Sequence, residues 1–116
     1  GGQMNRRALG KAYEEKAAAF LESRGYEILE RNFSSPGGEI DLIARDGQYL
    51  VFVEVKYRAD ASKGNPLEAV GPAKQERVRR TAAWYLMKKG ISQEVPCRFD
   101  VVGILGKEIV LVADAF

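Results

Sequence analysis

The sequence predicts a single mixed α/β domain in which helices pack on a central β-sheet, in the order α-β-β-β-α-β-β. Two segments, 6–23 and 72–90, have apolar residues at the spacing of an amphipathic helix. The runs between and after them are short, apolar and bounded by Gly, Pro or Asp, which is typical of strands. At 116 residues, the chain has the size of one domain that can bury a core without disulfide bonds.

Each predicted helix has a buried stripe and a recognisable end. The first ends before Gly25, and the second begins at Pro72 and ends at Gly90, which follows the preference for Pro at helix starts and Gly after helix ends. The stripe of the first consists of Leu9, Tyr13, Ala17, Phe20 and Leu21. That of the second consists of Val78, Ala82, Tyr85 and Leu86. Both stripes are expected to face the sheet.

Three strands are expected between the helices. The first lies near 27–31 and precedes a cluster of strand-breaking residues at 34–38. The next two, at 39–44 and 49–57, are separated by Asp46-Gly47, a dipeptide typical of tight turns. These two strands are therefore expected to form a β-hairpin.

The remaining segments are a loop and two more strands. The segment 59–71 is small, polar and interrupted by Gly and Pro, so it is expected to be a mobile loop. Strands are expected at 97–105 and 108–113, on either side of a turn at Gly106.

The composition excludes several kinds of chemistry. The chain has one cysteine, Cys97, and no histidine. An intramolecular disulfide, a Cys/His zinc site, a Ser-His-Asp triad and a Cys-His nucleophile are all excluded. An enzyme built from this chain would rely on carboxylates, amines, hydroxyls and a hard metal ion.

The overall charge and hydropathy give only general expectations. The net charge is +2, too small to indicate a partner by itself. No apolar run reaches the roughly 20 residues that span a bilayer, so no membrane partner is expected and a cytoplasmic location is the default. The three residues before Met4 resemble a cloning remnant, which leaves 4–116 as the predicted domain.

The strand 49–57 combines a buried pattern with charged residues. It is apolar on both faces from Leu50 to Val53, as in a central strand covered on both sides. Glu54 and Lys56 then follow on a common face, roughly 7 Å apart along the strand. Burying such charges costs several kcal/mol per ion unless they are paired or bound to a metal.

The preceding strand offers a partner for these charges. Simple alternation places Glu39, Asp41 and Ile43 on one face, and Ile40, Leu42 and Ala44 on the other. If the hairpin register brings Asp41 beside Glu54, two carboxylates and an ammonium meet at one point. Oxygen ligands without histidine favour Mg²⁺ or Mn²⁺.

Simpler interpretations of these residues stay open. The Glu54 and Lys56 pair also fits a surface salt bridge where the strand leaves the sheet, and Asp41 also fits a turn cap. On the first helix, Glu14 borders the buried stripe and is the acid best placed to reach the cluster, although a solvated helix flank explains it equally well.

Positive charge is concentrated on the second helix. Between Gly71 and Gly90, six basic residues accompany a single acidic one. Four of them gather on one side of the helix around Trp84: Lys74, Arg77, Arg80 and Lys88. A basic face with an aromatic residue suits a phosphate backbone, although such faces are also commonly just solvated and Trp84 also fits packing against the loop. Gln75, at the helix start, is a weaker candidate for orienting a water or phosphate.

Two blocks of the sequence carry a family resemblance. GEIDLIARDG (38–47) followed by LVFVEVKYR (50–58) resembles the D…E-x-K core of the PD-(D/E)xK, restriction-endonuclease-like superfamily. The sequence is more closely similar to the small bacterial YraN-like family, which is related to archaeal Holliday-junction resolvases. Further matches are Gly10, Glu14, RGYEILERNF (24–33), Lys74 and RFDVV (98–102). Ile40 stands where the superfamily name has proline, as is usual in resolvase-like members.

The resemblance implies a restriction-endonuclease-like fold and a set of catalytic roles. It implies that Asp41 and Glu54 bind the divalent metal, Mg²⁺ or Mn²⁺, helped by the backbone carbonyl of Val55. Lys56 would position the attacking water and offset charge in the transition state, and Glu14 would complete the site. Glu39 and Gln75 are weaker candidates. This scheme requires no histidine.

Three functions are compatible with these features. The first is a metal-dependent endonuclease on DNA rather than RNA, acting on branched or junction DNA as a homodimer, with Lys74, Arg77, Arg80, Lys88 and Arg58 as nucleic-acid contacts. The second is a nucleic-acid-binding module of the same fold that does not cleave. The third is a protein-interaction adaptor that uses the loop 59–71 and Trp84.

Overall fold

The computed structural model describes residues 6–58 and 70–116. In this part of the chain the fold consists of two helices and five strands, in the order expected from the sequence. The elements are α1 (Arg6–Ser23), β1 (Glu27–Ser35), β2 (Gly38–Asp46), β3 (Tyr49–Arg58), α2 (Pro72–Lys89), β4 (Cys97–Leu105) and β5 (Glu108–Val112). The predicted single mixed α/β domain is confirmed.

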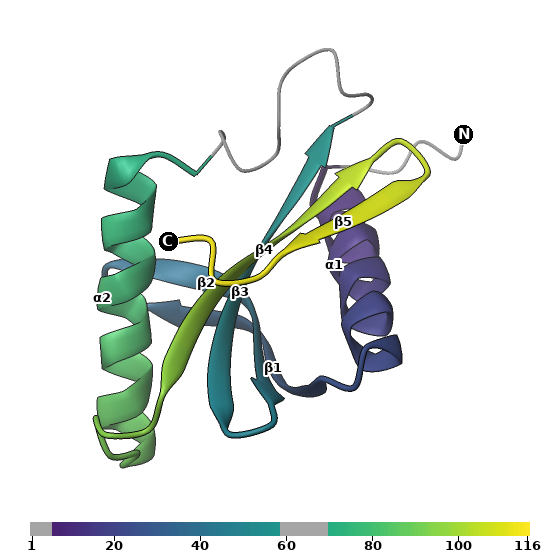
Figure 1. Ribbon diagram of the computed structural model, residues 1–116. Helices are drawn as coiled ribbons and strands as arrows, with labels where there is room; N and C mark the ends of the chain where they lie inside the picture. Colours follow the sequence, from purple (N-terminus) through teal and green to yellow (C-terminus); the bar gives the residue numbers. More distant parts are fainter. Residues whose placement is uncertain (1–5, 59–69) are drawn as a thin grey trace.

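The strands form one sheet with the order β1-β2-β3-β4-β5. Neighbouring strands are antiparallel except β3 and β4, which are parallel from Leu50↔Cys97 to Arg58↔Leu105. Parallel neighbours need a long crossover connection, and α2 lies within it. Figure 1 shows α1 and α2 on opposite sides of the sheet.

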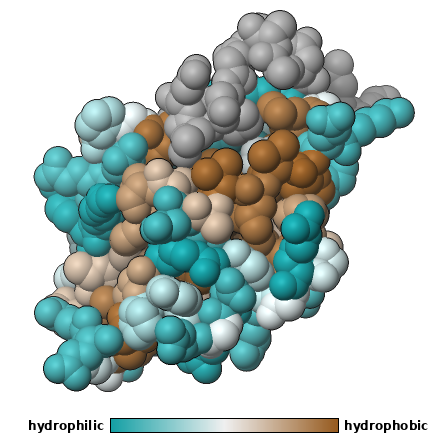
Figure 2. Space-filling view, in the orientation of Figure 1, coloured by the Kyte–Doolittle hydropathy of each residue, from teal (hydrophilic) through white to brown (hydrophobic). Residues whose placement is uncertain are grey.

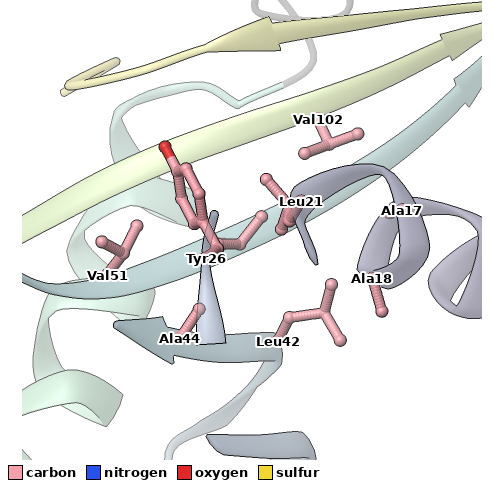
Figure 3. Close-up of a cluster of buried hydrophobic side chains, with 9 residues drawn as sticks. Ala17, Ala18, Leu21, Tyr26, Leu42, Ala44, Val51 and Val102 are labelled. Carbon is pink, nitrogen blue, oxygen red and sulfur yellow. The ribbon is translucent and has the colours of Figure 1, made fainter. Parts of the chain in front are cut away.

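Each helix closes its own hydrophobic core against one face of the sheet. On the α1 side, Ala17, Ala18 and Leu21 pack against alternate residues of the central strands (Figure 3). The strand members of this cluster are Leu42, Ala44, Val51, Val53 and Val102, and Tyr26 joins them. On the α2 side the cluster comprises Phe33, Ile40, Ile43, Leu50, Phe52, Val78, Ala82 and Tyr85. Covering both faces makes β3 the buried central strand that its sequence predicts.

The first hairpin differs from the prediction. β1 continues to Ser35 rather than ending near residue 31, and the strand-breaking residues form the turn between Ser35 and Gly38, which pair with each other. A Cβ at Gly38 would lie 3.1 Å from Oγ1 of Thr81 on α2. Glycine at this position therefore lets α2 pack closely on the start of β2.

Three further observations concern the loop and the surface. The predicted loop 59–71 lies outside the described residues except for its last two positions.

Neither described helix has the combination of length and apolar content needed to cross a membrane. Figure 2 shows a largely hydrophilic surface with apolar side chains gathered on one part of this face. Val110, on the edge strand β5, is among the exposed apolar residues.

Candidate functional site

The hairpin of β2 and β3 stops pairing where the candidate acids begin. The ladder runs from Asp46↔Tyr49 to Leu42↔Val53, and Asp41 and Glu54 are the next residues along the two strands. Oδ2 of Asp41 accepts a hydrogen bond from the backbone N–H of Val55 at 2.8 Å. A carboxylate therefore satisfies a β3 donor just beyond the end of the ladder.

This arrangement corrects the predicted alternation of β2. Ile40 packs with Ile43 in the core on the α2 side, whereas Leu42 packs on the α1 side. The prediction that Ile40 shares a face with Leu42 was wrong, because the strand is irregular where the pairing ends and Asp41 turns toward β3. Asp41 nevertheless lies close to Glu54 as expected, since its charge and a side-chain hydrogen bond raise the pKa of Glu54.

Glu54 is a buried carboxyl group with incomplete hydrogen bonding. Its exposed fraction is 1%, and its Oε2 lies 3.6 Å from Nζ of Lys74. Its Oε1 is buried and has no hydrogen-bond partner among the described residues. The pKa of Glu54 is raised to about 8, chiefly by burial and next by the charge of Asp41, while Lys74 and Lys56 oppose the shift. The two lysines therefore do not offset the combined effect of burial and of Asp41 on this carboxyl group.

Glu14 reaches the same place from the other side of the sheet. It lies on α1, and burial raises the pKa of its carboxyl group, with the charge of Asp41 as the next cause. A hydrogen bond with Asn32 opposes this shift. Asn32 has φ 54°, a left-handed conformation that asparagine tolerates better than most residues. Asp41 thus interacts with both Glu14 and Glu54, and we call these three residues the acid cluster.

The acid cluster was tested for its fit to a divalent metal. Among residues 6–58 and 70–116, no group of three or more Asp, Glu or Cys side chains is arranged to hold a metal ion. Mg²⁺ in proteins is commonly bound through only one or two carboxylates, with waters and substrate phosphates as the other ligands. Asp41 and the unpartnered oxygen of Glu54 fit that requirement. The backbone N–H of Val55 donates to Asp41, and this bond does not involve the backbone carbonyl of Val55. Metal binding by the Val55 carbonyl therefore stays a prediction.

Two lysines lie beside Glu54. Lys56, predicted from the E-x-K spacing, follows on β3 and lowers the pKa of Glu54 by its charge. Lys74 forms an ion pair with Glu54, although the sequence suggested only an outward contact with nucleic acid. The Nζ of Lys74 is therefore part of the site and not of the outer surface of α2.

Gln75 lies in the first turn of α2, next to Lys74. Its side-chain nitrogen donates to the backbone carbonyl of Val70 at 2.9 Å. This bond ties the first turn of α2 to the preceding segment, and the hypothesis that Gln75 orients a water or phosphate stays a prediction.

The other predicted basic residues are Arg77, Arg80 and Lys88 on α2 and Arg58 at the end of β3. Arg77, Arg80 and Lys88 are exposed on α2, and Trp84 is 37% exposed near them in sequence. Arg80 pairs with Glu76 at 3.6 Å, and Arg58 donates to the carbonyl of Tyr57 at 2.8 Å. These side chains form an accessible basic surface rather than a part of the acid cluster.

A second charged network lies at the other end of the domain. Arg98 donates hydrogen bonds to Asp46, Asp100 and the hydroxyl group of Tyr26, over distances of 2.6–3.0 Å. Asp100 is fully buried and also accepts bonds from Tyr26 and the N–H of Asp114. All these hydrogen bonds are internal, so the RFD and RGY segments hold the strands together here. The sequence analysis did not single out this network beyond the family match.

The surface also has a hollow that the sequence did not predict. Its volume is about 560 Å³, and it is lined by Arg7, Gly10, Lys11, Glu14, Asn32, Ser34 and Glu39. Glu39, a weaker candidate for the site, is exposed in this hollow. The signal available in the sequence was the i, i+3, i+4, i+7 spacing of four of these residues on the first helix.

Comparison with known proteins identifies the family of this chain. A family model described as uncharacterised protein family UPF0102 matches residues 13–104. The chain belongs to this family, the YraN-like group.

Relatives of the chain occur in several bacteria. A UPF0102 protein of Lachnoclostridium phytofermentans is 48% identical over 97% of this chain and 96% of its own length. One of Symbiobacterium thermophilum is 54% identical over 84% of this chain and 82% of its own length. One of Hahella chejuensis is 47% identical over 81% and 75%, respectively. Their names state the family and no activity.

Proposed function

We propose that this protein is a metal-dependent endonuclease that hydrolyses phosphodiester bonds of DNA. The observation that carries the proposal is Glu54, a buried carboxyl group beside Asp41 with one oxygen unpartnered among the described residues. Two neighbouring acids at the end of a strand pair, with Lys56 and Lys74 beside them, resemble the acid and lysine core of this superfamily. A purely structural pair of this kind would be less costly if it were apolar.

The residues divide the work of hydrolysis between them. Asp41 and Glu54 would hold Mg²⁺ or Mn²⁺, which when bound lowers the pKa of a water and offsets charge on the phosphate. Lys56 would orient the attacking water and neutralise charge that develops on the phosphate oxygens. Lys74 holds Glu54 in place and supplies a second positive charge near the phosphate. Glu14 would complete the acid cluster from α1.

The exposed basic residues of α2 support nucleic acid as the substrate. Arg77, Arg80 and Lys88 offer contacts to phosphates beside the site that contains Lys74, at the start of the same helix. DNA with a branch or junction is the substrate that the family resemblance implies. A homodimer would cut two strands symmetrically, and the exposed Val110 on the edge strand β5 offers apolar surface for it.

The proposal is tested by cleavage assays with purified protein. We expect cleavage of junction, flap or single-stranded DNA in Mg²⁺ or Mn²⁺, loss of cleavage with EDTA, and less cleavage of the matched RNAs. Lys56→Ala should abolish cleavage, whereas Lys107→Ala, in the exposed turn between β4 and β5, should retain it. Equal background cleavage by the wild type and the Lys56→Ala variant on every substrate would overturn the proposal.

A second candidate is a nucleic-acid-binding module that does not cleave. The ion pair between Lys74 and Glu54 favours it, because this lysine already supplies part of the charge that a metal would supply. This candidate predicts DNA binding that EDTA does not change, and no heat of binding for Mn²⁺ in calorimetry. The endonuclease instead predicts a heat of binding for Mn²⁺ and DNA cleavage that EDTA abolishes.

A further inference from the structure

The hollow on α1 borders the acid cluster at Glu14. Glu14 belongs to both, since it lines the hollow and interacts with Asp41. Arg7, Gly10, Lys11 and Glu14 lie three or four residues apart, so they line one side of the helix. The opposite wall comes from Asn32 and Ser34 of β1 and Glu39 of β2. A ligand in the hollow would therefore reach the acid cluster along α1.

The chemistry of the lining suits a phosphate backbone. Arg7 and Lys11 are both exposed and stand one helical turn apart. The lining also includes the carboxyl groups of Glu14 and Glu39, but Arg7 and Lys11 offer two cations in succession to an extended anionic chain. The Ser34 hydroxyl and Asn32 amide add neutral hydrogen-bonding groups. Phosphate contacts of this kind fix the position of a strand without reading its sequence.

Gly10 keeps the hollow open. A Cβ at this position would meet no other atom within 4 Å among the described residues, so a side chain would project into free space. Glycine inside a helix costs about 0.5–1 kcal/mol relative to alanine. Packing against the described residues therefore does not require glycine at this position. Glycine does, however, leave space in the hollow for a ligand.

We propose that this hollow binds the phosphodiester backbone of the strand that enters the acid cluster, with Arg7 and Lys11 contacting its phosphates and Gly10 leaving room for it. The inference rests on the proposed function and adds a DNA path along α1 to the basic surface of α2. It assigns a positioning role to residues that the sequence analysis did not select for binding.

Two pairs of variants test this path. Gly10→Leu fills the hollow, and its control is Ala19→Leu, at an exposed position of the same helix outside the hollow. The double variant Arg7→Gln/Lys11→Gln removes two cations, and its control, Lys16→Gln/Lys107→Gln, removes two exposed cations elsewhere. Binding of a fluorescein-labelled four-way DNA junction and of a single strand is measured by anisotropy in EDTA, at several salt concentrations.

We expect Gly10→Leu to weaken binding roughly tenfold, while its circular dichroism and Tm match those of Ala19→Leu, since a loss of roughly 1.4 kcal/mol is tenfold in affinity. The Arg7→Gln/Lys11→Gln variant should reduce the salt slope by about 2, which corresponds to two phosphate contacts. It creates no bulk and so tests the path even if Gly10→Leu does not fold.

The outcomes separate this inference from the proposed function. If the wild type binds DNA and both test variants bind like their controls, the path along α1 is wrong while the endonuclease proposal stands. If the wild type binds no DNA at low salt, the proposed function is overturned and this inference falls with it.

Discussion

The backbone N–H of Val55 on β3 donates a hydrogen bond to Oδ2 of Asp41 on β2 at 2.8 Å, immediately beyond the last paired residues of the hairpin. Asp41 therefore has two roles, and a substitution that removes both cannot tell them apart. It satisfies a donor of the central strand, and it places a negative charge beside Glu54 and Glu14. Asparagine retains an acceptor oxygen and removes the charge, so it separates the two tasks.

The first prediction compares Asp41→Asn with Asp41→Ala. Asp41→Asn should keep a free energy of unfolding within about 1 kcal/mol of the wild type, whereas Asp41→Ala should lose about 1–3 kcal/mol because the Val55 N–H loses its partner. Both should lose Mn²⁺ binding in titration calorimetry. Urea denaturation measures the stabilities. Wild-type affinity for Mn²⁺ in Asp41→Asn would contradict the assignment of Asp41 to the metal.

The second prediction concerns Glu54 in the metal-free protein. Glu54→Gln should raise the free energy of unfolding by on the order of 1–3 kcal/mol, because it removes a buried acid that lies beside Asp41. The matched control is Glu76→Gln on the exposed face of α2, which should change stability by less than about 0.5 kcal/mol. Thermal denaturation in EDTA measures both. A destabilised Glu54→Gln variant would show that the ion pair with Lys74 outweighs the cost of burial.

Much of this site could be predicted from the sequence because local rules determine it. The two-residue turn Gly47-Gln48, one position later than the predicted Asp46-Gly47, sets the hairpin register with Asp46 opposite Tyr49, and this register brings Asp41 and Glu54 to corresponding positions just beyond the ladder. The direction of Asp41 was not predictable, since it depends on a hydrogen bond formed where pairing stops. The inward position of Lys74 was also missed, because a helical wheel does not show which end of the helix lies over the strand ends.

The Arg98 network shows the same limit at longer range. Its partners are Asp46 on β2, Asp100 on β4 and Tyr26, which lies just before β1 and 74 residues from Asp100. No local periodicity links such distant residues, so their contact follows only from the assembled sheet. The hollow likewise combines α1 with β1 and β2.

The third prediction concerns this network. Arg98→Ala should destabilise the protein by about 3–5 kcal/mol, because it leaves the fully buried Asp100 without its guanidinium partner. Arg80→Ala, which breaks an ion pair whose side chains are 63% and 70% exposed, should cost less than about 1 kcal/mol. Urea denaturation compares the two variants. Equal small losses would mean that the network contributes little to stability.

The last prediction concerns stability at alkaline pH. The pKa of Tyr26 is raised to about 12, chiefly by burial, then by its hydrogen bond to Asp100 and by the charge of that residue. Because the folded state holds the phenolic proton more tightly than the unfolded state, whose pKa is 10.0, this contribution is complete below pH 10 and is lost as the pH rises toward 12. Arg98 opposes the shift by its charge.

The variant Tyr26→Phe removes this titration. It should be less stable than the wild type at pH 9, because the hydroxyl group bonds Asp100 and Arg98. The difference should narrow by about 1 kcal/mol at pH 11, where the wild type alone loses the contribution. Guanidinium denaturation at the two pH values measures these differences, and an unchanged gap for Tyr26→Phe would contradict the coupling between its hydroxyl group and Asp100.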